Sequence, residues 1–408
     1  MVQVHPFKSI RPKAELADKV AALPYDVVNS QEARDLAAAN PYSYFHIDKA
    51  EIDLPTDLSP YDEKVYQQAA ENLAAFLEKG WLFKETEACF YLYELVMAGR
   101  SQTGIVACTS ISDYIDEKIK KHEFTRHEKE IDRMNHIRTC DANTSPIFLS
   151  YRPQTAIQTT IKKWQKDHVP VYDFVSYHEV THRVWVIDQA DTIEELTNLF
   201  TEVDALYIAD GHHRTESAVK IGLEKRQTGK QNPETEQFLS IIFPEDELAI
   251  WEYNRVLKTT PPADFMARLA ENYQVTKTDL KKPAKAGDCQ LYDGSAWYTM
   301  RIKPEKVPND PVEKLDVALL QKFVLEDIFG IDDIRTDKRI DFVGGIRGTT
   351  ELEKLVDSGE WKLAFSMYPT QMTDLLDVAD AKKIMPPKST WFEPKLLSGL
   401  FLHDLETK

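Results

Sequence analysis

The sequence predicts a mixed α/β fold, and three stretches carry this prediction. Residues 60–79 place apolar side chains on one helical face, and Gly80 follows as a stop signal. Residues 89–96 and 104–111 are apolar runs on either side of a short polar turn, which is typical of paired strands. Residues 205–225 form an apolar run, a glycine break and a helical pattern. Strands and helices therefore mix along the chain.

The other elements follow from the same patterns of periodicity, capping and breakers. Residues 238–243 and 249–253 look like a second hairpin, and residues 279–287, rich in Lys, Ala and Pro, predict a loop or linker. The further expected strands are 2–10, 184–187 and 361–367, and the further expected helices are one after Asn29 or Ser30, and those at 155–164, 192–200, 263–273, 315–329 and 370–383.

The length of 408 residues exceeds the size at which a single core usually keeps growing. We therefore expect more than one part. Residues 1–277 are assigned to a core that carries the candidate site, and residues 278–408 to a C-terminal α/β portion that packs on it.

Charge and cysteine content exclude several classes of protein. A formal net charge of −17 opposes binding to nucleic acids and to anionic membranes. The N-terminus has no apolar signal core, and no apolar run is long enough to span a bilayer, so we expect a cytoplasmic protein. The four cysteines lack C-x-x-C spacing, and His178 and His182 sit in strand-like surroundings, so no structural metal is expected.

The strongest candidate site is the stretch from Asp210 to Arg214, where an apolar run gives way to a helix. Gly211 permits close approach of the backbone, and a helix N-terminus with His212, His213 and Arg214 favours an anionic oxygen group such as phosphate. Asp210 would then hold a metal ion, an ammonium group or a substrate hydroxyl. The alternative is an aspartate cap followed by solvated polar residues.

Asp26 is a second candidate, because it follows Pro24-Tyr25 just before a capped helix. A carboxylate there would orient or deprotonate a substrate hydroxyl, or help hold Mg²⁺. The alternative is a turn aspartate that bonds its own backbone.

Two further groups add basic residues. His122 and Arg126 lie in the charged stretch 117–138, ahead of any clear helix, and would face a ligand from a loop; the rest of that stretch is assigned to a solvated helix. Lys388, Ser389 and Thr390 follow two prolines and suit phosphate contacts, with a packed tail as the alternative.

We also predict that Arg214 matters more to activity than to folding.

Five segments together resemble a large bacterial and archaeal family known as domain of unknown function 1015, over nearly the whole chain. These segments are residues 23–27, 121–123, 207–214, 253–257 and 385–390. The Asp-Gly-His-His-Arg element also resembles the phosphate-handling turn of the ParB/sulfiredoxin superfamily, which includes nucleotide-dependent free-serine kinases. Two features depart from the pattern: Thr215 replaces a frequent aromatic residue, and Asp26 and Asp210 are much further apart than in compact members of the superfamily.

The resemblance implies a ParB/sulfiredoxin-like nucleotide-site core elaborated by long insertions. It also implies that ATP or a related nucleotide, with Mg²⁺ held through Asp26 or Asp210, phosphorylates a small hydroxyl metabolite, with free L-serine the first candidate. In that interpretation Asp26, Asp210, His212 and His213 are catalytic. Phosphate is bound by Gly211, Arg214, His122, Arg126, Lys388, Ser389 and Thr390. The alternative function is a nucleotide-binding regulator without useful turnover.

Overall fold

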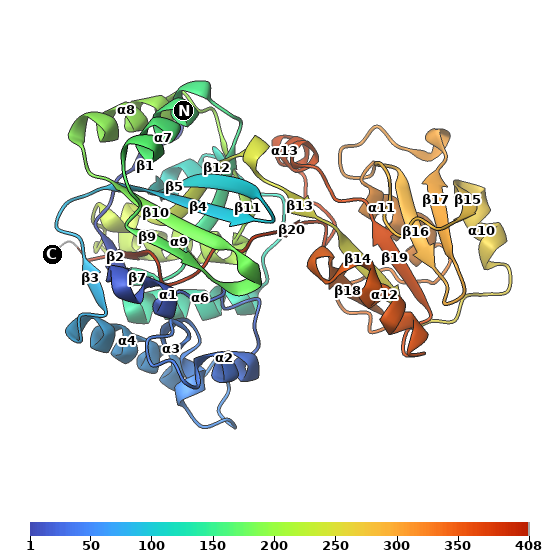
Figure 1. Cartoon of the computed structure of the whole chain (residues 1–408), viewed down its shortest axis with the longest axis horizontal. Coiled ribbons are helices and arrows are strands. Elements are labelled where there is room, and N and C mark those ends of the chain that lie inside the picture. The colour runs from blue at the N-terminus through green and yellow to red at the C-terminus, as the bar shows by residue number, and fades with distance from the viewer. Residues whose placement is uncertain (407–408) are drawn as a thin grey trace. The chain divides into compact units, whose positions relative to one another are not determined.

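The computed structural model describes residues 1–406, and the chain forms two compact units (Figure 1). The first unit comprises Met1–Leu248 and the segment from Pro394 onward, and the second comprises Ala249–Glu393. The division therefore falls elsewhere than the expected boundary at residue 277. Strand β14 (Tyr253–Leu257) pairs with two later strands of the second unit, which ties the residues just after 249 to that unit.

The first unit is built around a nine-stranded mixed sheet, in agreement with the predicted α/β class. Its two parallel pairs are β6 with β11 and β12 with β8, and the other neighbours are antiparallel. In sheet order the strands are β6 (Ile119–Lys120), β11 (Leu206–Asp210), β8 (Ile147–Tyr151), β12 (Gln237–Pro244), β5 (Arg100–Ser110), β4 (Phe90–Met97), β10 (Thr181–Ile187) and β9 (Tyr172–Val175), with β1 (Val4–His5) also paired to β5.

The predicted pairing of β4 with β5 is confirmed. Met97 faces Arg100 across a two-residue turn in which Ala98 and Gly99 have φ of 51° and 78°, the conformation that matches the twist of a hairpin. The second expected hairpin is wrong. β12 pairs with β5 and β8, whereas β13 (Ile250–Trp251) pairs with β20 (Trp391–Phe392), so the two apolar runs belong to different units.

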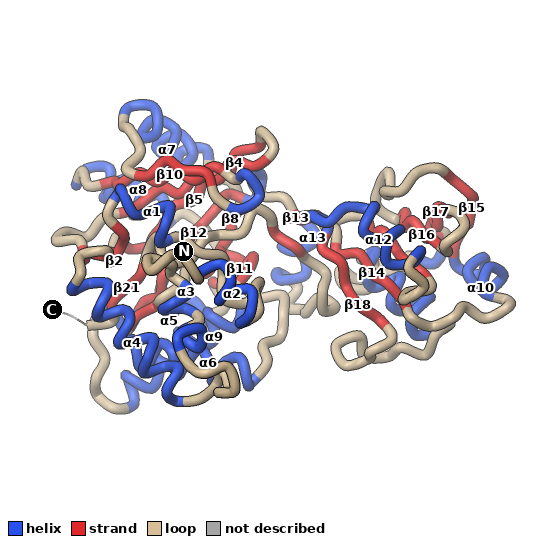
Figure 2. Tube along the Cα trace, turned by 60° about the horizontal axis from the view of Figure 1, so that its bottom comes forward, coloured by secondary structure: helices blue, strands red, loops and turns tan. Residues whose placement is uncertain are grey.

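Helices cover both faces of the large sheet. α7 and α8 lie on one side of it, and α6 and α9 lie on the other (Figures 1 and 2). The helices of the first unit are α1 (Ala17–Val20), α2 (Ser30–Ala37), α3 (Phe45–Asp48), α4 (Glu63–Glu78), α5 (Ile111–Ile115), α6 (His127–Cys140), α7 (Thr155–Asp167), α8 (Ala190–Thr201) and α9 (His212–Gln227).

A smaller sheet of four antiparallel strands completes the first unit. Its order is β3 (Leu82–Lys84), β2 (Ser9–Pro12), β21 (Leu402–Asp404) and β7 (Ala142–Asn143). The C-terminal strand β21 sits between β2 and β7, which explains why the end of the chain belongs to the first unit.

The second unit carries a six-stranded antiparallel sheet. In order its strands are β15 (Tyr273–Thr278), β17 (Trp297–Ile302), β16 (Asp288–Tyr292), β19 (Leu363–Met367), β14 (Tyr253–Leu257) and β18 (Ile340–Gly344), and its helices are α10 (Phe265–Asn272), α11 (Asp316–Leu320), α12 (Gly348–Asp357) and α13 (Met372–Asp380). The expected loop at 279–287 connects β15 to β16. Helix α12 packs on this sheet through Leu352 and Val356, which share a buried cluster with Val256 and Trp361.

Within residues 1–406, no helix combines the length and the apolarity needed to cross a membrane.

Candidate functional site

The candidate site is centred on the junction between β11 and α9, where sequence analysis placed it. Asp210 ends the strand, Gly211 caps the helix with φ of 93°, and α9 begins at His212. A side chain at Gly211 would combine this left-handed backbone with a Cβ 3.0 Å from Nε of Arg214, so only glycine fits without strain. The pairing of β11 with β8 also shifts register between Ile208 and Asp210, as at a β-bulge.

The parallel strand β6 explains how the charged stretch reaches this junction. Leu206 and Tyr207 of β11 pair with Ile119 and Lys120 of β6, so both strands end at the same edge of the sheet. The loop after β6 therefore runs beside the first turn of α9. The prediction that His122 and Arg126 precede a helix is confirmed, because α6 begins at His127.

His212 and His122 lie against each other in the interior. Their ring centroids are 4.5 Å apart in an edge-to-face arrangement, and their exposed fractions are 6% and 2%. The backbone N–H of His122 donates to Nε2 of His212 at 3.4 Å, and Nδ1 of His212 lies 3.8 Å from a carboxylate oxygen of Glu123. Burial lowers the pKa of His122 to about 4 and lowers that of His212 well below its usual value. Both rings are therefore neutral at pH 7.

His213, the next residue of α9, is half-buried. Its Nε2 accepts a hydrogen bond of 3.0 Å from the backbone N–H of Arg126, the residue that precedes α6. Burial lowers the pKa of His213, and the carboxylate of Asp26 opposes this effect. Arg126 thus reaches the turn through its backbone, while its side chain is exposed.

Asp210 is an ionised carboxylate held by cations and a backbone donor. Burial favours its neutral form, but Lys395, Arg214 and other neighbours lower the pKa of Asp210 to about 2. One carboxylate oxygen lies 3.4 Å from Nζ of Lys395, and the other accepts a 2.8 Å bond from the N–H of Gly211. Its charge is therefore already balanced within the first unit.

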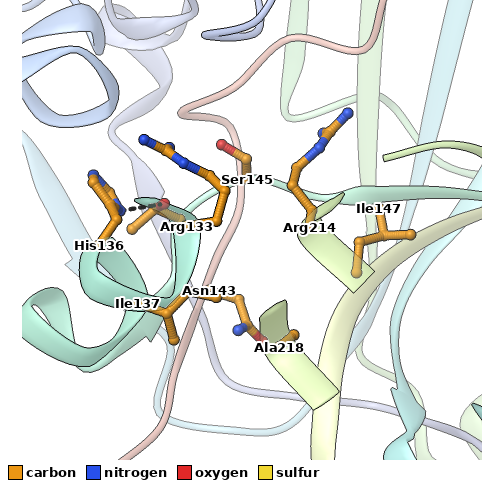
Figure 3. A pocket seen from close by; sticks show the side chains of 9 residues that line it. Arg133, His136, Ile137, Asn143, Ser145, Ile147, Arg214 and Ala218 are labelled. Atoms are coloured by element: carbon orange, nitrogen blue, oxygen red, sulfur yellow. Dashed lines mark hydrogen bonds between the residues drawn. The ribbon is translucent and has the colours of Figure 1, made fainter. Parts of the chain in front are cut away.

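Arg214 is buried rather than aimed at solvent. Its Nη1 donates to the carbonyl of Pro146, its Nη2 is 3.9 Å from Asp210, and its Nε has no hydrogen-bond partner among the described residues. Arg214 lines a cavity of about 20 Å³, large enough for one water, together with Arg133 and Ser145 (Figure 3). The guanidinium ties α9 to the backbone before β8, so Arg214 has a structural contact beside the role in activity that the sequence predicts.

Asp26, which belongs to the N-terminal region, lies near His213 and Arg214. It is exposed, in a turn ahead of α2, and its charge opposes the effect of burial, which acts to lower the pKa values of both His213 and Arg214. The neighbouring Tyr25 is buried, and the guanidinium of Arg133 lies 3.9 Å from the centre of its ring. The Pro-Tyr-Asp and Asp-Gly-His-His-Arg segments are therefore assembled at one place, although they are distant in sequence.

Lys388, Ser389 and Thr390 belong to the second unit, and Lys388 and Ser389 have contacts of their own there. The carbonyl of Lys388 accepts a 3.0 Å bond from buried Arg255, and Nζ of Lys388 lies 3.3 Å from the hydroxyl of Tyr253. The hydroxyl of Ser389 donates to the carbonyl of Pro386 at 2.6 Å. These contacts agree with the packed tail that the sequence left open for this segment.

Two residues of the site were not singled out from the sequence. Glu123 stands beside His212, and its place in the Lys-His-Glu segment is the signal that could have marked it. Lys395 reaches Asp210 from the returning C-terminal segment, and no local pattern predicts that contact. Neither contact could be predicted from spacing in the sequence, because the fold brings together residues that are far apart along the chain.

These features define a mixed α/β protein with a histidine-rich strand-to-helix turn at a sheet edge. The family model described as "Protein of unknown function (DUF1015)" matches residues 4–318, and the chain belongs to this family. No protein with a curated description matches the chain.

Several solved structures are similar to the chain at low sequence identity. A free serine kinase in complex with AMP is 14% identical, with 71% of this chain and 86% of that chain covered and a TM-score of 0.36. SbnI with a C-terminal truncation from Staphylococcus aureus is 11% identical, with 72% and 85% covered and a TM-score of 0.39. A conserved hypothetical protein from Pyrococcus furiosus is 13% identical, with 73% and 94% covered and a TM-score of 0.34. At these values no residue role follows from those structures.

Proposed function

We propose that the protein binds ATP or a related nucleotide at the turn between β11 and α9 and transfers a phosphoryl group to a small hydroxyl compound, with free L-serine as the first candidate. The observation that carries this proposal is the gathering of Asp26, Asp210, His213 and Arg214 from distant segments around one helix N-terminus.

The N-terminus of α9 supports the phosphate-binding part of the proposal. The helix has 16 residues, its first N–H groups have no acceptor within the helix, and Gly211 lets an anion approach the backbone. Burial is the main cause of the lowered pKa values of His212 and His213. The positive charges of Lys121 near His212, and of Arg126 and Lys129 near His213, add to this effect. In a chain with a net charge of −17, these cations offset the nearby carboxylates of Asp26 and Asp210, which favours the approach of a polyphosphate.

An exposed aromatic side chain supports the nucleotide in particular. Phe124 directly follows Glu123 in the loop beside the turn, and 69% of its surface is exposed. A phenyl face in this position would stack on a purine base, which gives sequence-tolerant affinity of about 1–3 kcal/mol per base in proteins that bind nucleic acid strands.

Asp26 is the residue that we assign to the acceptor. It is an exposed carboxylate, and its charge reaches His213 and Arg214. The hydroxyl oxygen of the acceptor would form a bond to the terminal phosphorus while the bond from that phosphorus to the leaving nucleotide oxygen breaks. The hydroxyl proton would pass to Asp26.

Magnesium fits this arrangement only in part. Mg²⁺ requires oxygen ligands, and Asp210, one of the two expected ligands, already accepts from Gly211 and faces Lys395. Asp26 remains, but the acceptor hydroxyl requires it. We therefore assign magnesium to the phosphates of the nucleotide and route no step through a protein-bound ion.

The test combines ligand binding with product formation. ATP, ADP and AMP are added to the full chain with and without L-serine, and melting temperature and O-phosphoserine are measured, because a ligand that binds the native state raises the melting temperature. We expect Asp26→Asn to keep the nucleotide-induced stabilisation and to lose at least about 100-fold in turnover, the usual size of a general-base effect. Asp35→Asn, an exposed carboxylate on α2, serves as the control.

Two outcomes would decide against the proposal. If no nucleotide raises the melting temperature, the turn is not a nucleotide site. If nucleotides bind but neither serine nor other small hydroxyl compounds are phosphorylated, the regulatory alternative without turnover replaces the kinase.

A further inference from the structure

Three side chains at the end of β6 and the start of α9 could hold a metal ion together. They are His122, Glu123 and His212, and each offers a ligand atom that lies within 4.8 Å of the other two. The two parallel strands β6 and β11 end at one sheet edge, so residues 122 and 212 meet although sequence spacing gives no hint of a pair. The chain thus brings ligand atoms of two imidazoles and one carboxylate within 4.8 Å of one another.

The burial of His122 and the lack of hydrogen-bond partners for its ring indicate a ligand. The residue is 2% exposed, yet neither of its ring nitrogens has a well-formed hydrogen bond. A buried polar group without a partner costs about 1–3 kcal/mol, so such groups are rare unless a water, an ion or a substrate completes them. The ring lies edge-to-face with His212 at 4.5 Å between centroids, and one of its nitrogens lies within 4.8 Å of ligand atoms of both His212 and Glu123.

His212 and Glu123 offer the other two ligand atoms. The carboxylate of Glu123 lies 3.8 Å from Nδ1 of His212 and is 48% exposed, whereas His212 is almost fully buried. The centre is therefore enclosed by protein on the histidine side and open to solvent on the glutamate side. An ion could enter there and keep a water or a substrate oxygen as a further ligand.

We propose that His122, Glu123 and His212 form an open binding site for a divalent transition-metal ion, with Zn²⁺ as the first candidate. Two imidazoles with one carboxylate and a free position are typical of zinc and of neighbouring first-row metals, whereas Mg²⁺ and Ca²⁺ prefer oxygen ligands alone. The site does not depend on the nucleotide proposal, since it uses neither Asp26 nor Arg214. It also differs from the closed structural site that the sequence argues against.

Metal binding requires a small local rearrangement. A neutral His212 that coordinates through Nδ1 carries its proton on Nε2, so the N–H of His122 can no longer donate there. That contact is already long at 3.4 Å. We therefore expect the NMR resonance of the His122 backbone amide to shift when the ion binds.

The experiment uses the full chain after removal of metals with a chelator. Zn²⁺ binding is measured by calorimetry, and Co²⁺ is added in parallel because its visible absorption reports tetrahedral nitrogen and oxygen ligands. Glu123→Gln and His122→Gln are compared with Glu128→Gln and His178→Gln, which change an exposed glutamate and an exposed histidine elsewhere. The amide resonance of His122 is followed in the same titration.

We expect one ion per chain, and affinity at least about tenfold weaker in each site variant than in its control, because loss of a ligand costs at least as much as loss of a supporting residue. The His122 amide should shift on addition of Zn²⁺. If His122→Gln fails to fold, the half-exposed Glu123→Gln still gives the answer. No stoichiometric binding by the wild type, or equal binding by site variants and controls, would overturn the proposal.

Discussion

Nζ of Lys395 lies 3.4 Å from a carboxylate oxygen of Asp210, and this contact joins the returning C-terminal segment to the end of β11. The two residues are separated in sequence by the whole second unit. The charge state of the candidate site therefore depends on a residue outside every motif that marks it.

Replacement of this lysine should change the titration of Asp210. Lys395 is the largest of the groups that lower the pKa of Asp210 to about 2, so Lys395→Met should move that pKa upward. A depressed carboxyl pKa stabilises the native state above the unfolded value of 3.8, and this stabilisation is lost as pH falls through about 2. Carbon-13 NMR of the carboxyl group measures the shift. Lys225→Met, which removes a 3.0 Å pair with Asp141, should leave Asp210 unchanged.

Arg214→Ala should destabilise the protein as well as impair any activity at the turn. The variant removes a buried donor to the carbonyl of Pro146 and leaves Asp210 with one cation fewer, which we expect to cost about 2–4 kcal/mol. Arg138→Ala breaks a pair with Glu224 in which both side chains are nearly half-exposed, and should cost less than about 1 kcal/mol. Unfolding in denaturant compares the two. Equal costs would show that the contacts of Arg214 contribute no more than a surface pair.

Gly211→Ala tests the shape of the turn. The variant places a side chain at φ of 93° and a Cβ 3.0 Å from Nε of Arg214. Gly229→Ala imposes a similar backbone strain, at φ of 67°, where nothing lies within 4 Å. We expect about 1 kcal/mol or more for strain in both, and a further loss only at Gly211, because Arg214 must move. Equal falls in the two melting temperatures would show that the guanidinium of Arg214 can move without a further loss of stability.

How much of this arrangement could be predicted from the sequence depends on the range of the interaction. The strand-turn-helix around Gly211 was predictable, because an apolar run, a glycine and a helical pattern are local signals. The meeting of Asp26, His122 and Lys395 with that turn was not, since sheet order and the return of the C-terminal segment decide it. The burial of Arg214 was missed for the same reason: the carbonyl of Pro146 that holds it lies just before another strand.

The boundary between the two units could not be predicted from local sequence patterns either. A loop rich in Lys, Ala and Pro suggested a boundary near residue 277, but composition alone cannot distinguish a linker from a loop between paired strands. β15 and β16 both pair with β17, so that loop lies inside a single sheet. The false hairpin at 238–253 arose because two adjacent apolar runs fit any pairing partner equally well.

Acid should destabilise the protein through His182. Burial lowers the pKa of this residue to about 3, and Nδ1 shares a 2.7 Å hydrogen bond with the hydroxyl of Tyr93. Between pH 6.5 and 3 the unfolded chain binds a proton that the native chain does not, so stability is retained above pH 6.5 and falls below it. Each tenfold difference in proton affinity is worth about 1.4 kcal/mol.

The difference between wild type and His182→Gln isolates this effect. Urea unfolding at several pH values should give a shallower acid dependence for the variant. His178→Gln, which changes an exposed histidine, should follow the wild type. A variant with the same acid dependence as the wild type would exclude His182 as the source.

The place of β21 between β2 and β7 has a consequence for synthesis on the ribosome. Every residue of the second unit is translated before β21, so the second unit can complete its sheet while the four-stranded sheet of the first unit still lacks its inner strand. Until residues 402–404 emerge, β2 and β7 each leave an open edge, the kind of surface that recruits chaperones or pairs with other chains. Asp210 also lacks its contact with Lys395 during this interval, so the candidate site acquires its final charge only after the whole second unit has been translated.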